Sequence, residues 1–364
     1  MKPLNEIVSH FGINANDNDI RHLGDGLIND TYKVTSVQAG DNSVYVLQRI
    51  NHHIFKDVDK LQRNIEIVTR HIRCRLEAQG VKDPDRRSLR FLNTQDTGKT
   101  YHFDGEDYWR MMVFIDNTFT RKAVTPDNAY RTGTAFGEFQ YMLSDITEVL
   151  DESIPDFHNM EFRLTQFRDA VNSDIAGRAS GVIDIIGELE HRSEHACLAE
   201  RLHREGKLPK RICHCDTKVD NILFDQEGNV VCVIDLDTVM PSFVFSDFGD
   251  FLRTAANTGK EDDPDTANVE FNMDVFRQFA NGYLESAGCF LTPLEIKLLP
   301  YASERFAYMQ AIRFLTDYLN GDTYYKTEYP EHNLIRAKAQ FALLRSIESK
   351  IDEMTDHIHN LTHV

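Results

Sequence analysis

The sequence lacks the features that mark several special classes of protein. No apolar run reaches the roughly 18 residues of a membrane-spanning helix, and residues 1–13 have neither the apolar stretch nor the cleavage site of a secretory signal peptide. Glycine and proline number only 19 and 10 among 364 residues, without an internal repeat. These absences exclude membrane-spanning, collagen-like and low-complexity proteins, and we expect a cytoplasmic protein with no membrane partner.

Cysteine is also scarce, with six residues in the chain and no C-x-x-C pair. Cys213 and Cys215 flank His214, but neighbouring residues of a strand point to opposite faces. No second cluster of cysteine and histidine lies at the spacing of metal ligands. We therefore predict reduced thiols, as in a cytoplasm, and no zinc site at this segment.

Positive charge is in deficit, because 40 lysines and arginines stand against 58 aspartates and glutamates, a net charge of −18. The phosphate backbone of a nucleic acid selects surfaces rich in lysine and arginine, so we expect no nucleic-acid partner. The hydrophobic fraction of 41% is sufficient for a packed core. The length corresponds to about two domains.

The first third of the chain has the composition of a β-rich lobe. Residues 57–77 carry apolar side chains at steps of three and four, which predicts a helix. Runs rich in β-branched and aromatic residues predict strands on both sides of this helix, at 31–37, 44–50, 88–92, 99–103 and 108–115. We therefore expect a β-rich lobe at residues 1–115.

The rest of the chain is predominantly helical in pattern. Apolar residues recur with helical spacing at 130–143, 162–170, 183–202, 275–284, 293–319 and 333–357. A single β island, at 222–224 and 230–234, interrupts these helices. The sequence predicts an α+β protein of two lobes, whose helical lobe spans residues 116–364.

The β island carries residue types that phosphoryl transfer from ATP requires. Residues 214–221 read H-x-D-x-K-x-x-N, and Asp235 ends the apolar strand that follows. The reaction needs one carboxylate to orient or deprotonate the acceptor hydroxyl, and oxygen ligands to hold Mg²⁺ against the phosphates. Asp216, Lys218 and Asn221 have the spacing of the catalytic loop of a protein kinase. Together these residues predict a phosphotransferase.

Segments spread over nearly the whole chain resemble one family. HCDTKVDN at 214–221 and IDLD at 234–237 are similar to the aminoglycoside phosphotransferase and choline kinase superfamily, which has a protein-kinase-like fold. More specifically, several segments resemble the bacterial N-acetylhexosamine 1-kinases. They are GDGLINDTY (24–32), YVLQRIN (45–51), RNIEIVT (63–69), AFGEFQ (135–140), IDLDTVMP (234–241), SDFGD (246–250), RFLTDYLNGD (313–322) and EYPEHNLIRAKAQ (328–340). The resemblance implies transfer of the ATP γ-phosphate to the anomeric hydroxyl of N-acetylglucosamine or N-acetylgalactosamine, with Mg²⁺.

The resemblance also implies roles for the residues of the catalytic loop and the following strand. Asp216 would be the catalytic carboxylate on the sugar hydroxyl, and Lys218 would reach the γ-phosphate unless it is only a solvated lysine. Asn221 and Asp235 would bind magnesium. Asp237 would support the residues that bind the metal or bind a second metal ion, or otherwise it would be a surface carboxylate.

Two segments would hold the nucleotide. A glycine loop before the first expected strand would lie over the phosphates, unless it is a simple hairpin turn. The end of the last expected strand of the first lobe would offer backbone groups to adenine. The residues concerned are Gly24, Asp25, Gly26, Met112, Phe114 and Ile115.

Two positions depart from the family pattern. Gln48 stands where relatives usually have a lysine or arginine on the third strand, and Arg49 would face the other side unless a bulge turns it inward. Glu66 on the following helix is a candidate ion-pair partner for this position. Leu27 replaces a histidine expected in the glycine loop, so the identity of the sugar stays open. Arg313 resembles an arginine that contacts the sugar.

Other interpretations stay open at this point. The same fold could serve choline, homoserine, methylthioribose or an aminoglycoside as the acceptor, or be a catalytically silent binding protein. The Asp235-Leu236-Asp237 triplet would also suit the metal site of a glycosyltransferase, although the alternating strand–helix units of that fold are missing. Asp247 and Asp250 are expected to brace the catalytic loop rather than to contact substrate.

Overall fold

The computed structural model of the protein describes residues 2–24, 28–37 and 43–363. The chain forms two compact units, each made of three segments. The first unit contains Met1–Phe119, Asp145–Pro155 and Leu223–Met240, and the second contains Thr120–Ser144, Asp156–Ile222 and Pro241–Val364. The expected boundary at residue 115 is close to the end of the first segment, but two later segments also belong to the first unit.

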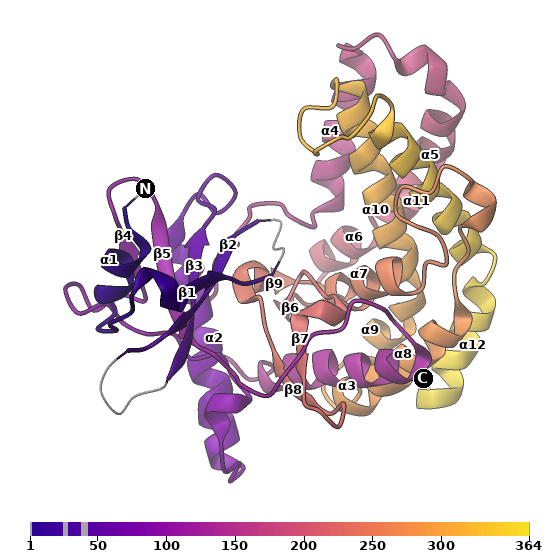
Figure 1. Ribbon diagram of the computed structural model, residues 1–364. Helices are drawn as coiled ribbons and strands as arrows, with labels where there is room; N and C mark the ends of the chain where they lie inside the picture. Colours follow the sequence, from indigo (N-terminus) through magenta and orange to yellow (C-terminus); the bar gives the residue numbers. More distant parts are fainter. Residues whose placement is uncertain (1, 25–27, 38–42, 364) are drawn as a thin grey trace. The chain divides into compact units, whose positions relative to one another are not determined.

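The first unit is built on an antiparallel sheet (Figure 1). Its strands follow the order β1-β2-β3-β5-β4 across the sheet. They are β1 (Ile20–His22), β2 (Asp30–Thr35), β3 (Val44–Ile50), β4 (Tyr101–Phe103) and β5 (Tyr108–Val113). The expected strand at 88–92 is reduced to a single bridge between Phe91 and Met112. The other four expected strands form.

One face of this sheet contributes to an apolar core. Leu47 on β3 and Trp109 and Met111 on β5 are fully buried there, beside residues of α1 (Leu4–Ser9). Because side chains alternate along a strand, the residues between them point to the opposite face. Helix α2 (Val58–Ala78) begins where the Asp57 carboxylate accepts a hydrogen bond from the backbone N–H of Lys60, at 3.0 Å.

The second unit consists mainly of helices. They are α3 (Pro126–Met142), α4 (Met160–Ser173), α5 (Ile183–Ala196), α6 (Leu198–Arg204), α7 (Phe245–Ala255), α8 (Met273–Ala287), α9 (Pro293–Lys297), α10 (Leu299–Leu319), α11 (His332–Glu348) and α12 (Ile351–Thr362). Helices α3 and α8 pack closely at glycines: a Cβ atom on Gly133 would lie 2.2 Å from the carbonyl oxygen of Phe279. Three expected long helices are each divided in two, at Cys197, Leu298 and Ser349–Lys350.

Four short strands lie around the expected catalytic loop. Strand β6 (Arg211–Cys213) pairs with β9 (Met240–Ser242), and β7 (Ile222–Phe224) pairs with β8 (Val230–Val233). Short 3₁₀ helices complete the chain: Asp17–Asp19, Pro84–Arg86, Ala179–Val182, η4 (Val219–Asn221), η5 (Leu236–Thr238) and Thr266–Asn268. The catalytic loop therefore lies between β6 and β7, and Asp235 directly precedes η5.

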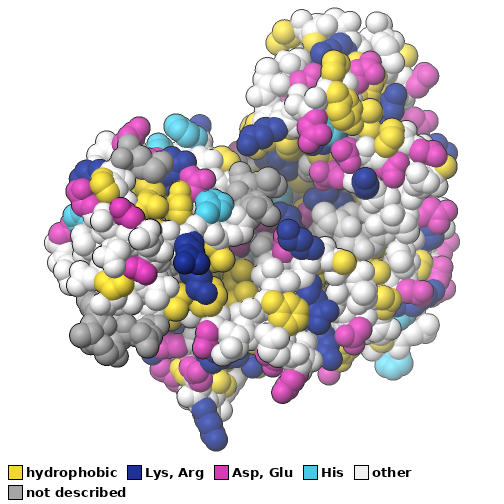
Figure 2. Space-filling view, in the orientation of Figure 1, with side chains coloured by type: hydrophobic (Ala, Val, Ile, Leu, Met, Phe, Trp, Pro, Cys, Tyr) yellow, Lys and Arg dark blue, Asp and Glu magenta, His cyan; other side chains and the backbone are white. Residues whose placement is uncertain are grey.

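Two surface properties bear on possible partners. Within residues 2–24, 28–37 and 43–363, no helix has both the length and the apolar character needed to cross a bilayer. On the face shown in Figure 2, basic side chains are scattered among acidic ones. The mixed charges on this face are those of an ordinary solvated surface.

Candidate active site

The loop after β6 holds Asp216 through a left-handed backbone turn. Cys215 has a φ of 63°, a conformation that non-glycine residues adopt only when their surroundings hold them in place. His214 is fully buried, with its ring edge-on to Phe136 and Phe139. Its Nδ1 accepts a hydrogen bond of 3.3 Å from the backbone N–H of Asp216.

Asp247 on α7 fixes this turn. Its carboxylate accepts hydrogen bonds from the backbone N–H groups of His214 (2.9 Å) and Cys215 (2.8 Å) and from the side-chain amide of Gln140 (2.6 Å). The Thr217 hydroxyl also donates to the Asp247 carbonyl oxygen, at 2.7 Å. Burial raises the pKa of Asp247, while His214 and these donors favour its charged form. The expectation that Asp247 braces the loop is therefore met by its contacts.

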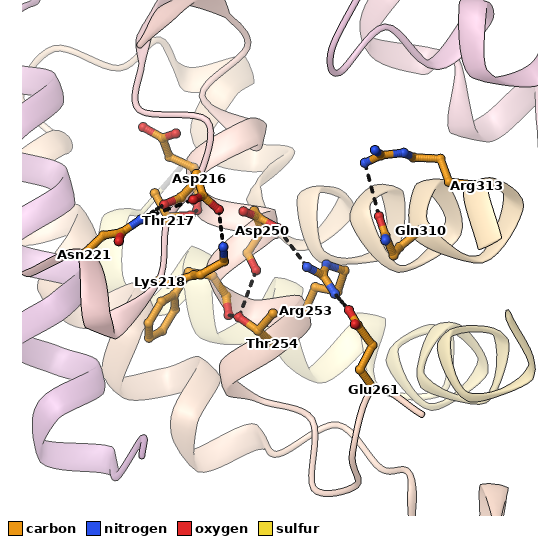
Figure 3. A network of polar contacts seen from close by, with 12 residues as sticks. Asp216, Thr217, Lys218, Asn221, Asp250, Arg253, Thr254, Glu261, Gln310 and Arg313 are labelled. Carbon is orange, nitrogen blue, oxygen red and sulfur yellow. Dashed lines mark hydrogen bonds and ion pairs between the residues drawn. The ribbon is translucent and has the colours of Figure 1, made fainter. Parts of the chain in front are cut away.

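The Asp216 carboxylate lies within a small polar network (Figure 3). One of its oxygens is 2.7 Å from Lys218 Nζ. The side-chain amide of Asn221 donates to the other oxygen (3.3 Å) and to the Asp216 carbonyl oxygen (2.8 Å). The Asp216 side chain remains 24% exposed, so an acceptor can reach it. Burial acts to lower the pKa of Lys218, but the Asp216 carboxylate outweighs it and raises that pKa.

Asp250 lies one helical turn beyond Asp247 and is anchored differently. Its carboxylate pairs with Arg253 at 3.3 Å, and Arg253 also contacts Glu261 at 3.0 Å (Figure 3). Burial raises the pKa of Asp250, opposed by Arg253 and reinforced by Asp216. Asp250 thus adds negative charge near the loop, and its recorded contacts hold α7 rather than the loop backbone.

The first unit contains the other expected metal ligands. Asp235 adopts a left-handed conformation, with φ of 60°, at the start of η5. Asp237 is only 4% exposed; one carboxylate oxygen pairs with Arg110 and the other accepts a hydrogen bond of 2.7 Å from Asn29. The alternative that Asp237 is a surface carboxylate is therefore wrong. Both of its oxygens are already engaged by protein groups.

The third strand of the sheet resolves the question of Gln48 and Arg49. Pairing of β3 with β2 and β5 runs without a break, so no bulge turns Arg49 inward. Arg49 instead pairs with Asp30 and Asp107. Gln48 accepts a hydrogen bond of 2.9 Å from Nε of Arg110. At the position where a lysine or arginine was expected, this strand therefore has the neutral amide of Gln48, which contacts the buried Arg110.

Glu66 does not act as the expected ion-pair partner. Its carboxylate accepts a hydrogen bond from the Thr100 hydroxyl, whereas Arg49 has the two aspartate partners given above. The expected ion pair is wrong because Arg49 and Gln48 lie on opposite faces of the sheet and each finds its partner on a neighbouring strand.

Arg110 is a residue of this site that the sequence reasoning missed. It is 2% exposed and joins Gln48 to Asp237. A signal was present, because Arg110 lies between Trp109 and Met111 in an otherwise apolar strand. A charge in such a position requires a buried partner, but its partner follows 127 residues later.

The expected nucleotide segments are only partly described. Gly24 has a φ of 75°, which favours glycine, whereas Asp25, Gly26 and Leu27 lie outside the described residues. At the end of β5, Met112 and Ile115 are buried. The backbone N–H of Phe114 already donates to the Val44 carbonyl, at 3.0 Å, and so is not free for adenine.

Arg313 on α10 lines a cavity of about 540 Å³ within the second unit. Arg163 and the rings of Tyr324 and Tyr325 also line it. Neither arginine has an ion-pair partner among the residues that the structure describes; Arg313 donates to Gln310 at 3.3 Å. Burial and the nearby Arg313 lower the pKa of Arg163 to about 10. Figure 3 shows the Arg313 guanidinium extending toward the side on which Asp216 lies.

Comparison with known proteins agrees with this geometry. A family model described as the phosphotransferase enzyme family matches residues 19–285, which is most of the chain. The protein belongs to this family. Its membership excludes the glycosyltransferase alternative, as does the antiparallel order of the sheet.

Comparison with solved structures shows the fold of the protein. It is similar to an aminoglycoside phosphotransferase from Alicyclobacillus acidocaldarius, with a TM-score of 0.62 and 14% identity over 99% of this chain and 97% of that one. A spectinomycin phosphotransferase in complex with ADP and spectinomycin matches with a TM-score of 0.56 and 14% identity, over 96% and 98%. An ethanolamine kinase from Plasmodium vivax matches with a TM-score of 0.53 and 15% identity, over 92% and 85%. The expected protein-kinase-like α+β fold is confirmed.

Proposed function

We propose that the protein transfers the γ-phosphate of ATP to a hydroxyl group of a small acceptor, with Asp216 as the catalytic carboxylate. The observation that carries this proposal is the braced H-x-D-x-K-x-x-N loop, in which Asp247 fixes the backbone and leaves the Asp216 carboxylate accessible. Catalysis in such a site consists of positioning and charge stabilisation. A related structure that contains ADP supports the choice of nucleotide.

Mg²⁺ would be held by Asn221 and Asp235. The Asn221 amide nitrogen donates to Asp216, so its carbonyl oxygen is directed away from that bond and can serve as a ligand. Amide and carboxylate oxygens are the ligands that Mg²⁺ prefers, and the bound ion would neutralise charge on the phosphates. Asp237 has both oxygens engaged, and we assign it a positioning role through Arg110. Lys218 would stabilise charge near the transferred group.

For the acceptor we propose an N-acetylhexosamine, phosphorylated at its anomeric hydroxyl. The resemblance to N-acetylhexosamine 1-kinases at several segments supports this choice, and Arg313 belongs to one of them. The cavity that Arg313 lines also has Arg163, Asp169 and Asp317 on its wall. With two arginines and two aspartates, its charge does not disfavour a cationic acceptor. Arginine donors beside tyrosine rings suit a neutral acceptor rich in hydroxyl groups.

An ADP-release assay with Mg-ATP tests both parts of the proposal. The acceptor panel comprises N-acetylglucosamine, N-acetylgalactosamine, glucose, galactose, mannose, choline, homoserine and kanamycin, and phosphorus NMR locates the new phosphate. A phosphate on C1 of an N-acetylhexosamine is the expected result. Turnover of choline or kanamycin alone would contradict the sugar assignment and keep the phosphotransferase. ATP binding without any turnover would favour a silent binding protein.

Asp216→Asn tests the catalytic assignment. We expect turnover to fall by about 10² to 10⁴, the usual contribution of a positioned acid or base, while ATP binding and the melting temperature are retained. Asp220→Asn is the matched control, because Asp220 is an exposed aspartate of the same loop; it should keep near-normal turnover. Near-normal turnover of Asp216→Asn would refute the role of Asp216.

A further inference from the structure

A cluster of two histidines and one aspartate lies in the first unit, among residues to which the proposed function assigns no role. His10 directly follows α1, Asp96 belongs to the turn before β4, and His102 is the central residue of β4 (Figure 1). One ligand atom from each residue can be chosen so that all three lie within 4.8 Å of one another. The three side chains therefore converge on a single small volume.

The distances within this cluster leave room for an ion. The same oxygen of Asp96, Oδ2, is 3.4 Å from His10 Nδ1 and 3.9 Å from His102 Nδ1. These separations exceed a normal hydrogen bond of 2.7–3.2 Å. Ligands at about 2.0–2.1 Å from a tetrahedral zinc ion are separated by roughly 3.3 Å. The two observed distances, 3.4 and 3.9 Å, are close to this distance between the ligands of a tetrahedral ion.

The two imidazoles are held face to face by the fold. Their ring centroids are 3.7 Å apart, with an interplanar angle of 18°. Because the lone pair of an imidazole nitrogen lies in the plane of its ring, one of these nearly parallel rings must rotate before both can bind the same ion. His102 is only 10% exposed, and its Nε2 is buried without a hydrogen-bond partner among the described residues.

The turn that carries Asp96 is fixed on both sides. The other carboxylate oxygen, Oδ1, accepts a hydrogen bond of 2.8 Å from the backbone N–H of Thr97, which leaves Oδ2 directed at the histidines. The backbone N–H of Gln95 donates to the His10 carbonyl at 2.8 Å, so the turn is tied to the segment after α1. The Asp96 carboxylate is therefore already held in place for binding, whereas an imidazole ring has to turn.

We propose that His10, Asp96 and His102 form a binding site for a divalent first-row transition ion such as Zn²⁺. Two imidazoles and one carboxylate are a usual ligand set for such ions, and they disfavour Mg²⁺ and Ca²⁺, which take oxygen ligands. The exposed side of Asp96 leaves a fourth position for water. The bound ion would tie the amino-terminal segment to the edge strand β4.

Equilibrium dialysis of the full chain against ZnCl₂ tests the proposal. The protein is first stripped with EDTA, and excess Mg²⁺ is present so that sites with only oxygen ligands are occupied. We expect one Zn²⁺ per chain, with affinity at least about tenfold weaker in His10→Ala, His102→Ala and Asp96→Asn. His53→Ala is the matched control: His52 and His53 have ring centroids 4.5 Å apart, and the variant should bind Zn²⁺ as the unmodified protein does.

Two further measurements separate ligand loss from misfolding. Zn²⁺ should raise the melting temperature of the unmodified protein and not that of His10→Ala, while the two metal-free proteins should melt alike. Co²⁺ should give visible d–d absorption that His10→Ala loses. Unchanged Zn²⁺ affinity in the His10 and His102 variants, intense thiolate charge-transfer bands with Co²⁺, or no Zn²⁺ binding at all would each overturn the proposal.

Discussion

At the scale of single residues, a buried charge pair holds together part of the first unit. Arg110 and Asp237 are almost completely removed from solvent, and Arg110 also holds Gln48. The pair connects β5 to the turn that begins at Asp235. Gln48 is neutral, so the positive charge on this face of the sheet comes from Arg110. The ion pair of Arg110 with Asp237 also fixes the turn.

Replacement of Arg110 by methionine should be strongly destabilising. Asp237 would remain buried without its ionic partner, and breaking a buried pair in this way costs about 3–5 kcal/mol. Urea denaturation of the full chain measures the loss. Arg110→Met combined with Asp237→Asn is the control and should recover part of it, because the uncompensated charge is gone. An unchanged unfolding midpoint in Arg110→Met would contradict the assignment.

The catalytic loop was predictable at this scale, and Arg110 was not. Asp216, Lys218 and Asn221 lie within six consecutive residues, so their spacing alone places them in one loop. Asp247 was also expected to brace the loop, as was Asp250, whose recorded contacts lie within α7 instead. The partners of Arg110, Arg49 and Glu66 come from distant segments, and only the folded register decides which residue meets which.

At the scale of elements, helices α3 and α8 pack very closely, and glycines lie where their backbones meet. A Cβ on Gly282 would lie 2.1 Å from the Tyr130 carbonyl oxygen. Glycine therefore lets the two helix backbones approach. Helix α3 also carries Gln140, which donates to Asp247, so this packing supports the brace of the catalytic loop.

Gly133→Ala and Gly187→Ala should have opposite effects on stability. At Gly133 the added methyl group meets the backbone of α8, and overpacking of this kind costs about 1–3 kcal/mol. At Gly187 in α5 nothing lies within 4 Å, so alanine should stabilise the helix by about 0.5–1 kcal/mol. Thermal unfolding of the two variants measures both effects. A destabilised Gly187→Ala or a neutral Gly133→Ala would contradict the packing argument.

Helix boundaries illustrate what sequence patterns leave out. The apolar periodicity of 293–319 continues through Leu298, where the structure ends α9 and begins α10. Pro300 lies in the first turn of α10 and lacks a backbone N–H, so its position indicated the break. Helix α7 was not predicted, although its sequence carries the signal. Phe245, Phe248 and Leu252 recur at steps of three and four, which is the pattern of one apolar helix face.

At the scale of the whole molecule, stability should depend on pH through His158. Its ring packs against Phe157 and Phe306. Burial, followed by the charges of Arg313, Arg305, Arg163 and Arg253, lowers its pKa well below the usual value. In the unfolded chain this histidine takes up a proton below pH about 6.5, whereas in the folded protein it stays neutral. The free energy of unfolding is therefore highest above that pH and falls as the solution becomes more acidic.

His158→Gln tests this dependence, since glutamine does not titrate. Between pH about 6.5 and 5 the slope of unfolding free energy against pH should decrease by roughly 1.4 kcal/mol per pH unit, the equivalent of one proton. Chemical denaturation at a series of pH values measures the slope. His53→Gln serves as the control at an exposed site and should leave it unchanged. An equal slope in both variants would show that His158 takes up its proton in the folded state.

The division of the chain also has a consequence for its synthesis. A ribosome releases residues in order, but the first unit uses segments that end only at Met240. When β5 has emerged, Arg110 must wait for Asp237, 127 residues further along the chain. The amide of Asn64 likewise donates to the carbonyl oxygen of Val239, at 3.1 Å. All five strands of the sheet have emerged by then, but the unit around them stays incomplete until about two thirds of the protein has been translated. Folding of the amino-terminal unit is therefore completed late.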